Sequence, residues 1–88
     1  MRAIRVTVHG RVQGVGFRWS CLREAERLGI VGWVHNDPAG TVQVWIQGEE
    51  AAVGRMIAWC QEGPRHAWVE RVDQEPVKPQ ELSGFDVR

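Results

Sequence analysis

The sequence is poor in several residue types that would favour particular functions. It contains no tyrosine, two methionines, two cysteines and a single asparagine, and its eleven basic residues balance eleven acidic ones. Because the net charge is zero, no overall field attracts the chain to nucleic acid or to an anionic membrane. The charge balance therefore disfavours a general nucleic-acid binder, although it is still compatible with a local basic patch.

The two cysteines give no support for a metal site. Cys21 and Cys60 lie far apart in the sequence and form no CxxC motif. Each falls in an apolar stripe of a predicted helix, which favours buried free thiols over a disulfide. We therefore predict no metal and no cofactor.

The sequence also lacks long hydrophobic runs. No apolar stretch approaches the roughly 20 residues that a transmembrane helix requires, and the first residues alternate without the apolar core of a signal peptide. The expected location is therefore the cytoplasm, with no membrane partner. A chain of 88 residues is enough for one modest core, so we predict a single domain over residues 1–88.

The spacing of the apolar residues predicts five strands and two helices. The strands are expected at residues 4–9, 31–35, 42–47, 68–75 and 85–88. The first helix is expected from residue 19 to Gly29, and the second from Glu49–Glu50 to Gly63–Pro64. In the fourth strand, Val69 and Val72 are too far apart for strict alternation, which indicates a bulge.

This order, βαββαβ plus a short terminal strand, predicts an α+β fold. We expect a ferredoxin-like α/β sandwich with both helices on one face of a mainly antiparallel sheet. The other face should be partly open to water and carry Trp33 and Trp45. The remaining tryptophans, Trp19, Trp59 and Trp68, are expected to pack in the core or at its rim.

A glycine-rich segment, HGRVQGVGFRW (residues 9–19), separates the first strand from the first helix. Gly10, Gly14 and Gly16 would let the chain curl so that main-chain amides near the helix N-terminus point at an anion. Arg18, in the first helical turn, could grip two phosphate oxygens at once. The P-loop pattern is absent. By themselves these residues leave an ordinary turn as the simpler interpretation.

The segment closely resembles the signature of the acylphosphatase family, a G-x-VQGV-x-FR run. Similar segments follow in the family's order over nearly the whole chain: GIVGWVHN at residues 29–36, GTV at 40–42, GP at 63–64 with Ala67, Val69 and Val72, and GFDV at 84–87. Two positions depart from the family pattern. Ala39 replaces a usual Asp before the turn glycine, and Arg65 replaces a frequent proline, but neither change affects Arg18 or Asn36.

The resemblance implies an enzyme that hydrolyses small-molecule acyl phosphates without a metal. It further implies that the loop amides and Arg18 hold the phosphoryl group and that Asn36 orients the attacking water. The phosphate-binding residues would be Gln13, Gly14, Val15, Gly16, Phe17 and Arg18. Such a reaction suits this sequence, because a carboxylate whose acid has a pKa of about 4 departs without a proton from a general acid. Inorganic phosphate would be product and inhibitor, and a monomer is expected.

Two other interpretations compete with this one. RNA-recognition domains share the βαββαβ order, but they stack bases on aromatic side chains of the first and third strands. Here the polar side of the first strand offers Arg5, Thr7 and His9 but no aromatic residue of the kind that stacks on bases. The sequence therefore disfavours RNA binding. The second alternative is a non-catalytic acylphosphatase-like module, of the kind found in larger hydrogenase-maturation proteins.

Two histidines and one arginine near the site are given no catalytic role. His9 and His35 alternate to the polar side of their strands and are expected to be solvated. Arg11 is expected to be a solvated neighbour of the loop. No pocket for the acyl group can be identified in the sequence.

Overall fold

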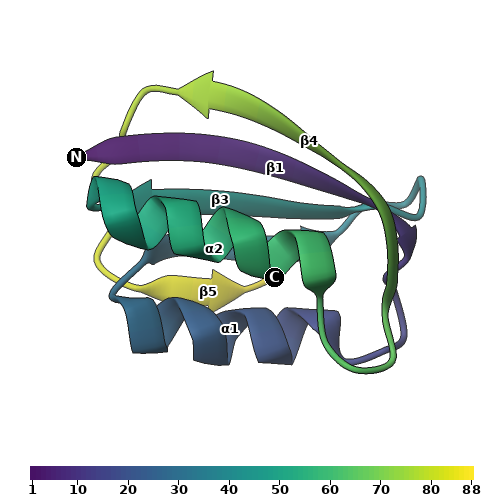
Figure 1. Cartoon of the computed structure of the whole chain (residues 1–88). Helices are drawn as coiled ribbons and strands as arrows, with labels where there is room; N and C mark the ends of the chain where they lie inside the picture. The colour runs from purple at the N-terminus through teal and green to yellow at the C-terminus, as the bar shows by residue number, and fades with distance from the viewer.

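The computed structural model describes all 88 residues and contains five strands and two helices (Figure 1). In chain order they are β1 (Arg2–Arg11), α1 (Phe17–Leu28), β2 (Val31–Asn36), β3 (Val42–Gly48), α2 (Glu50–Glu62), β4 (Trp68–Val77) and β5 (Phe85–Val87). The predicted order of elements is confirmed. Helix α1 begins two residues earlier than expected, at Phe17, because Gly16 in a left-handed conformation precedes the first helical turn.

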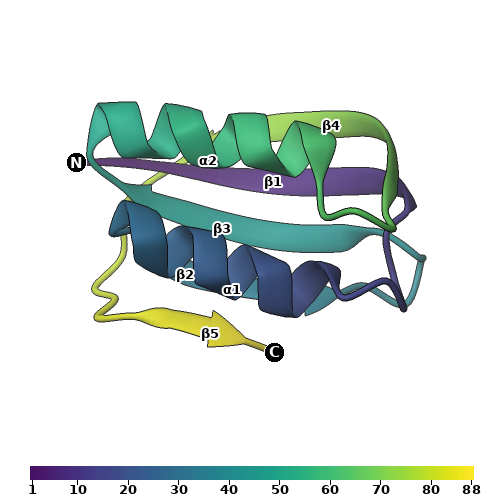
Figure 2. The ribbon, with the colours of Figure 1, turned by 60° about the horizontal axis from the view of Figure 1, so that its bottom comes forward.

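The strands form one sheet in the order β4-β1-β3-β2-β5, and both helices cover the same face of it (Figure 2). All neighbouring strands are antiparallel except β2 and β5, which are parallel. This is the predicted ferredoxin-like α+β arrangement. β3 lies between β1 and β2, and both run antiparallel to it. The last residues of β1 and β2 therefore lie at the same end of the sheet. The segment after β1 is thereby brought close to Asn36, the last residue of β2.

The core lies between the sheet and the two helices. It consists of sixteen buried side chains, among them Val6 and Val44, which pair directly across β1 and β3 and are both completely buried. Each fully buried aliphatic side chain of this size stabilises the fold by about 1.5–3 kcal/mol. Helix α1 contributes Phe17, whose ring packs edge-on against Trp59 of α2 with the ring centroids 5.2 Å apart. The helix that carries Arg18 is therefore anchored in the core at its first residue.

Cys21 and Cys60 are buried and free, as predicted. They belong to α1 and α2, the two helices that pack side by side over the sheet (Figure 1). Hydrogen bonding with Cys60 and burial raise the pKa of the Cys21 thiol well above its ordinary value. The thiol is therefore neutral at physiological pH.

The opposite face of the sheet carries Trp33 and Trp45 as expected, with their ring centroids 6.1 Å apart on paired positions of β2 and β3. Only part of this face is open. The segment between β4 and β5 crosses its edge, where the side chain of Gln47 donates to the main-chain oxygen of Gln80 (2.7 Å) and accepts from its nitrogen (3.0 Å). Both Trp45 and Gln47 are consequently buried.

The expectation that Trp19 and Trp68 pack in the core or at its rim is wrong. Trp19 is 60% exposed and Trp68 is 71% exposed. Trp19 falls between two buried α1 positions, Phe17 and Cys21, and so faces away from the sheet. Trp68 begins the edge strand β4 and precedes Val69, which packs against the core, so strand alternation turns the Trp68 side chain away from the core.

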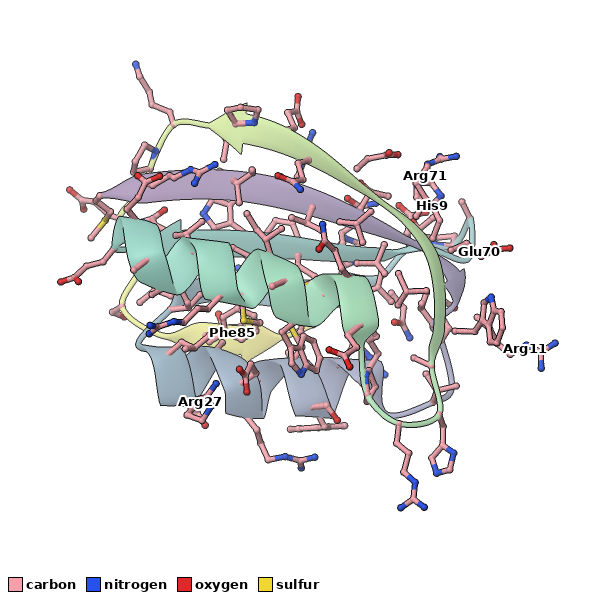
Figure 3. All side chains as sticks on the ribbon, in the orientation of Figure 1. His9, Arg11, Arg27, Glu70, Arg71 and Phe85 are labelled. Atoms are coloured by element: carbon pink, nitrogen blue, oxygen red, sulfur yellow. The ribbon has the colours of Figure 1, made fainter.

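The predicted bulge in the fourth strand is confirmed. The pairing of β1 with β4 shifts between His9, which lies opposite Arg71, and Gly10, which lies opposite Val69, so that Glu70 is left without a partner. The side chains of His9, Glu70 and Arg71 gather at this edge of the sheet, and Arg11 points into solvent beyond them (Figure 3).

Candidate active site

The loop between β1 and α1 presents a series of unpaired main-chain amides. Gly14 and Gly16 adopt left-handed conformations with φ of 74° and 80°, which only glycine adopts readily. No N–H group of residues 13–18 donates a hydrogen bond within the protein, and α1 has neither a side-chain cap nor an acidic residue in its first turn. These free donors and the positive end of the helix dipole make this a place for an anion.

A pocket of about 120 Å³ lies against this loop. Its lining includes Val12, Gly14, Gly16, Phe17, Arg18 and Asn36. The structure therefore brings the two principal candidates of the sequence analysis, Arg18 and Asn36, to one small pocket although they belong to different elements. Its dimensions and its row of amide donors suit a group of the size of a phosphate.

Arg18 occupies the first turn of α1 and is held by the C-terminal segment. Its Nη1 donates to the main-chain oxygen of Arg88 at 2.9 Å, and the nitrogen of Arg88 donates to Val34 of β2 at 2.8 Å. One guanidinium donor is thus fixed to the edge of the sheet, and the other N–H groups form no bond within the protein. This arrangement orients the planar group and leaves donors for a ligand.

Asn36 ends β2, opposite Val42 at the start of β3. Its Oδ1 is buried and has no hydrogen-bond partner in the protein. An unpaired buried acceptor costs about 1–3 kcal/mol, so its presence in a small domain requires an explanation. A bound molecule that donates a hydrogen bond to Oδ1 would supply one.

Gln13 connects the loop to the hairpin that carries Asn36. Its Nε2 donates to the main-chain oxygens of Asp37 (2.7 Å) and Thr41 (2.9 Å). Asp37 and Thr41 also bond to each other, with the nitrogen of Asp37 2.8 Å from the oxygen of Thr41. The side chain of Gln13 therefore clamps the β2–β3 turn, and only its main-chain amide is free to meet a ligand.

A second pocket, of about 310 Å³, adjoins the first. Arg18 and Asn36 line both pockets, and Trp33, His35 and Arg88 complete the second. Sequence reasoning missed these last three residues as site components. Strand alternation places Trp33 and His35 on the open sheet face, and no local signal indicates that the sheet edge beside them is uncovered.

The other polar residues considered in the sequence analysis lie outside both pockets. His9 Nε2 is 2.8 Å from Asp73 Oδ2, and Arg71 contacts both side chains. The Arg71 guanidinium and, to a lesser degree, the His9 ring hold the pKa of the Asp73 carboxyl below its usual value. His9 is thus only part-exposed and belongs to an ion-pair group on the β4 edge, whereas Arg11 is exposed as expected.

The arrangement of potential metal ligands and the character of the helices are two further properties of the structure. No group of three or more His, Cys, Asp or Glu side chains is arranged to hold a metal ion. Neither helix has the length and apolar character needed to cross a membrane.

Comparison with known proteins agrees with this geometry. The acylphosphatase family model matches residues 4–87. An acylphosphatase from Nocardioides sp. is 51% identical over 98% of this chain and 87% of its own length. Two solved acylphosphatase structures superpose on this one with a TM-score of 0.95 each. The protein from Coxiella burnetii is 40% identical, and the match covers 99% of this chain and 92% of that protein's chain. The protein from Bacillus subtilis is 30% identical, and the match covers 100% of this chain and 99% of that protein's chain. The chain belongs to the acylphosphatase family.

Proposed function

We propose that the protein hydrolyses acyl phosphates, mixed anhydrides of a carboxylic and a phosphoric acid, to a carboxylate and inorganic phosphate. The phosphoryl group lies in the 120 Å³ pocket. There the main-chain amides of residues 13–18 and the guanidinium of Arg18 bind its oxygens, and Asn36 orients the attacking water. The observation that carries the proposal is the unpaired, buried Oδ1 of Asn36 beside a row of free amides.

The chemistry needs little beyond positioning and charge stabilisation, which dominate phosphoryl transfer. The free amides and Arg18 offset the charge on the phosphoryl oxygens. Oδ1 of Asn36 accepts a hydrogen bond from the water and holds it for attack on phosphorus, but an amide is too weak a base to remove the proton. In this mechanism an oxygen of the phosphoryl group takes that proton, and the carboxylate departs with the electrons of the P–O bond.

We propose that the reaction is independent of a metal ion and of a general acid. A carboxylate leaving group with a conjugate-acid pKa of about 4 needs no proton to depart. Inorganic phosphate, which has the shape and charge of the transferred group, should compete with substrate for the loop.

We also propose a monomeric, cytoplasmic enzyme without a nucleic-acid partner. The basic Arg5 on the polar side of β1 is paired with Glu75 of β4, and Thr7 is bonded to Gln43 of β3. That face therefore offers no free cation or aromatic platform on β1 for stacked bases.

The direct test is hydrolysis of acetyl phosphate by the purified protein, with and without EDTA and with increasing inorganic phosphate. We expect release of phosphate that EDTA does not alter and that phosphate inhibits competitively. Failure to hydrolyse both acetyl phosphate and benzoyl phosphate would contradict the proposed function. Loss of activity in EDTA would contradict only the metal-independent mechanism.

A further inference from the structure

The 310 Å³ pocket exists because β5 is shorter than the strand it pairs with. β5 pairs with β2 only from Gly32 to Val34, and the nitrogen of Arg88 makes the last bond, to the oxygen of Val34. Beyond that point the outer edge of β2, at His35 and Asn36, has no neighbouring strand. The pocket lies at this uncovered edge and shares Arg18 and Asn36 with the smaller pocket.

The walls of this pocket combine aromatic surface with positive charge. The rings of Trp33 and His35 lie 5.4 Å apart at 51°, and the guanidinium carbon of Arg88 lies 5.2 Å from the centre of the Trp33 ring. The one ion-pair partner of Arg88 is Asp86, at 3.9 Å, and both side chains are more than half exposed. So long and exposed a pair contributes little, and the charge of Arg88 is available to a ligand.

We propose that this pocket binds the acyl group of the substrate and favours acyl groups that carry a second negative charge. The inference rests on the proposed function, because it takes the smaller pocket as the phosphoryl site. The substrates in this class are monophosphate anhydrides of dicarboxylic acids, whose free carboxylate would meet the guanidinium of Arg88. Trp33 and His35 would flank the intervening methylene groups.

Three features of the pocket lead to this class. The pockets share a wall, so a substrate with its phosphorus against the loop reaches the larger one through its bridging oxygen. A volume of about 310 Å³ is at the lower end of small-molecule sites, which span about 300–1,000 Å³, and accommodates a short chain. A ring in the acyl group would find the Trp33 face already covered by Arg88. A carboxylate would find a planar donor that matches it.

In-line displacement requires that water and leaving group lie on opposite sides of phosphorus. In the proposed arrangement the water is held on the loop side of Asn36, and the carboxylate departs on the side of Arg88. The bond formed is water oxygen to phosphorus, and the bond broken is phosphorus to the bridging oxygen. No other reactant takes part.

The test compares two substrates with acyl chains of equal carbon number, succinyl phosphate with a free carboxylate and butyryl phosphate without one. We expect the wild type to hydrolyse succinyl phosphate with the higher kcat/KM. The substitution Arg88→Gln should lower the succinyl-to-butyryl ratio of kcat/KM by about two- to fivefold, mainly through KM, as is typical for an exposed ion pair. It retains the main-chain oxygen that holds Arg18.

Two further variants make the result specific. Arg55→Gln removes the same charge from an exposed position of α2 outside both pockets and should leave the ratio unchanged. Arg88→Lys keeps the charge without the planar fork and should give an intermediate ratio. Higher salt should also lower the ratio for the wild type, because it screens the charges.

An unchanged ratio in Arg88→Gln, or the same fall in Arg55→Gln, would overturn the acyl-site inference while the proposed function stood. A wild-type preference for butyryl phosphate would overturn it as well. By contrast, a wild type that hydrolyses neither substrate would overturn the proposed function itself.

Discussion

At the scale of single residues, the two pockets depend most on Arg18 and Asn36, which line both. Arg18 uses one N–H group to bind the main chain of Arg88 and keeps the others for a ligand. Asn36 keeps a buried acceptor unpaired. Asn36 is therefore placed at some cost to the free protein, which is typical of residues retained for function.

Arg18→Gln should reduce kcat/KM for acetyl phosphate by about 10²–10³-fold, the loss seen when one preorganised donor to a developing charge is removed. The fold should survive, because the side chain is only half-buried and lies outside the core. Steady-state kinetics together with circular dichroism check both points. Arg18→Lys, which keeps the charge but not the fork, should be partly active. Wild-type activity of the Gln variant would remove Arg18 from the mechanism.

Asn36→Ala should lower kcat more than it weakens competitive inhibition by phosphate, since the residue acts on water rather than on the phosphoryl group. The same change removes an unpaired buried oxygen, so the free energy of unfolding should not fall by the amount usual for a buried polar group. Kinetics, phosphate inhibition and urea denaturation separate the two effects. A variant with unchanged kcat would rule out Asn36 as the residue that orients the water.

At the scale of elements, the site is assembled by contacts between the β1–α1 loop and the β2–β3 turn. The turn is held internally by Asp37, whose Oδ1 accepts from the nitrogen of Ala39 and whose main-chain oxygen accepts from the nitrogen of Gly40. Only the main-chain nitrogen of Ala39 takes part in this bonding, so the turn does not depend on the side chain at that position. Gln13 then attaches the turn to the loop.

Gln13→Ala should lower kcat by loosening the position of Asn36 relative to the loop, with less effect on phosphate inhibition. The loss of two neutral hydrogen bonds should reduce stability by about 1–3 kcal/mol. Gln13→Glu, similar in shape but unable to donate when ionised, should not restore activity. Gln61→Ala, at an exposed position of α2, serves as control. Equal losses of kcat and of phosphate affinity would indicate that Gln13 binds phosphate rather than positioning the turn.

At the scale of the whole molecule, the two helices are joined to one core in which both thiols are buried. Because hydrogen bonding with Cys60 and burial raise the pKa of Cys21, folding favours the neutral thiol. This contribution to stability is fully present below the ordinary pKa of a thiol and is lost as the pH rises above it. The effect of Cys21 should therefore lower the free energy of unfolding at strongly alkaline pH and leave it unchanged at neutral and acidic pH.

Native protein at neutral pH should react very slowly with a thiol reagent such as dithionitrobenzoate, and both thiols should react once the chain is unfolded in guanidinium chloride. Urea denaturation at pH 7 and at pH 10 should show lower stability at the higher pH, and a Cys21→Ala variant should lose part of that difference. Rapid labelling of the native protein would contradict the burial of the thiols.

The fold could be predicted from the sequence because apolar periodicity is a local property. Alternation at Ile4, Val6 and Val8 and the helical stripe at Cys21 and Ala25 place buried side chains at positions that the structure confirms. The spacing of Val69 and Val72 also indicated the bulge. Boundaries were less accurate: Phe17 begins α1, and β4 continues through Pro76, which an edge strand tolerates.

By itself, the sequence determined the order of the elements, the glycine-rich loop at the start of a helix and the candidates Arg18 and Asn36. Only the tertiary structure decided which side chains share a pocket with them. The clamp of Gln13 joins residues 24 and 28 positions apart, and the contact of Arg18 with Arg88 spans 70. Such contacts arise from strand order and from the short pairing of β5, whereas periodicity reports only which way a side chain faces along its own element.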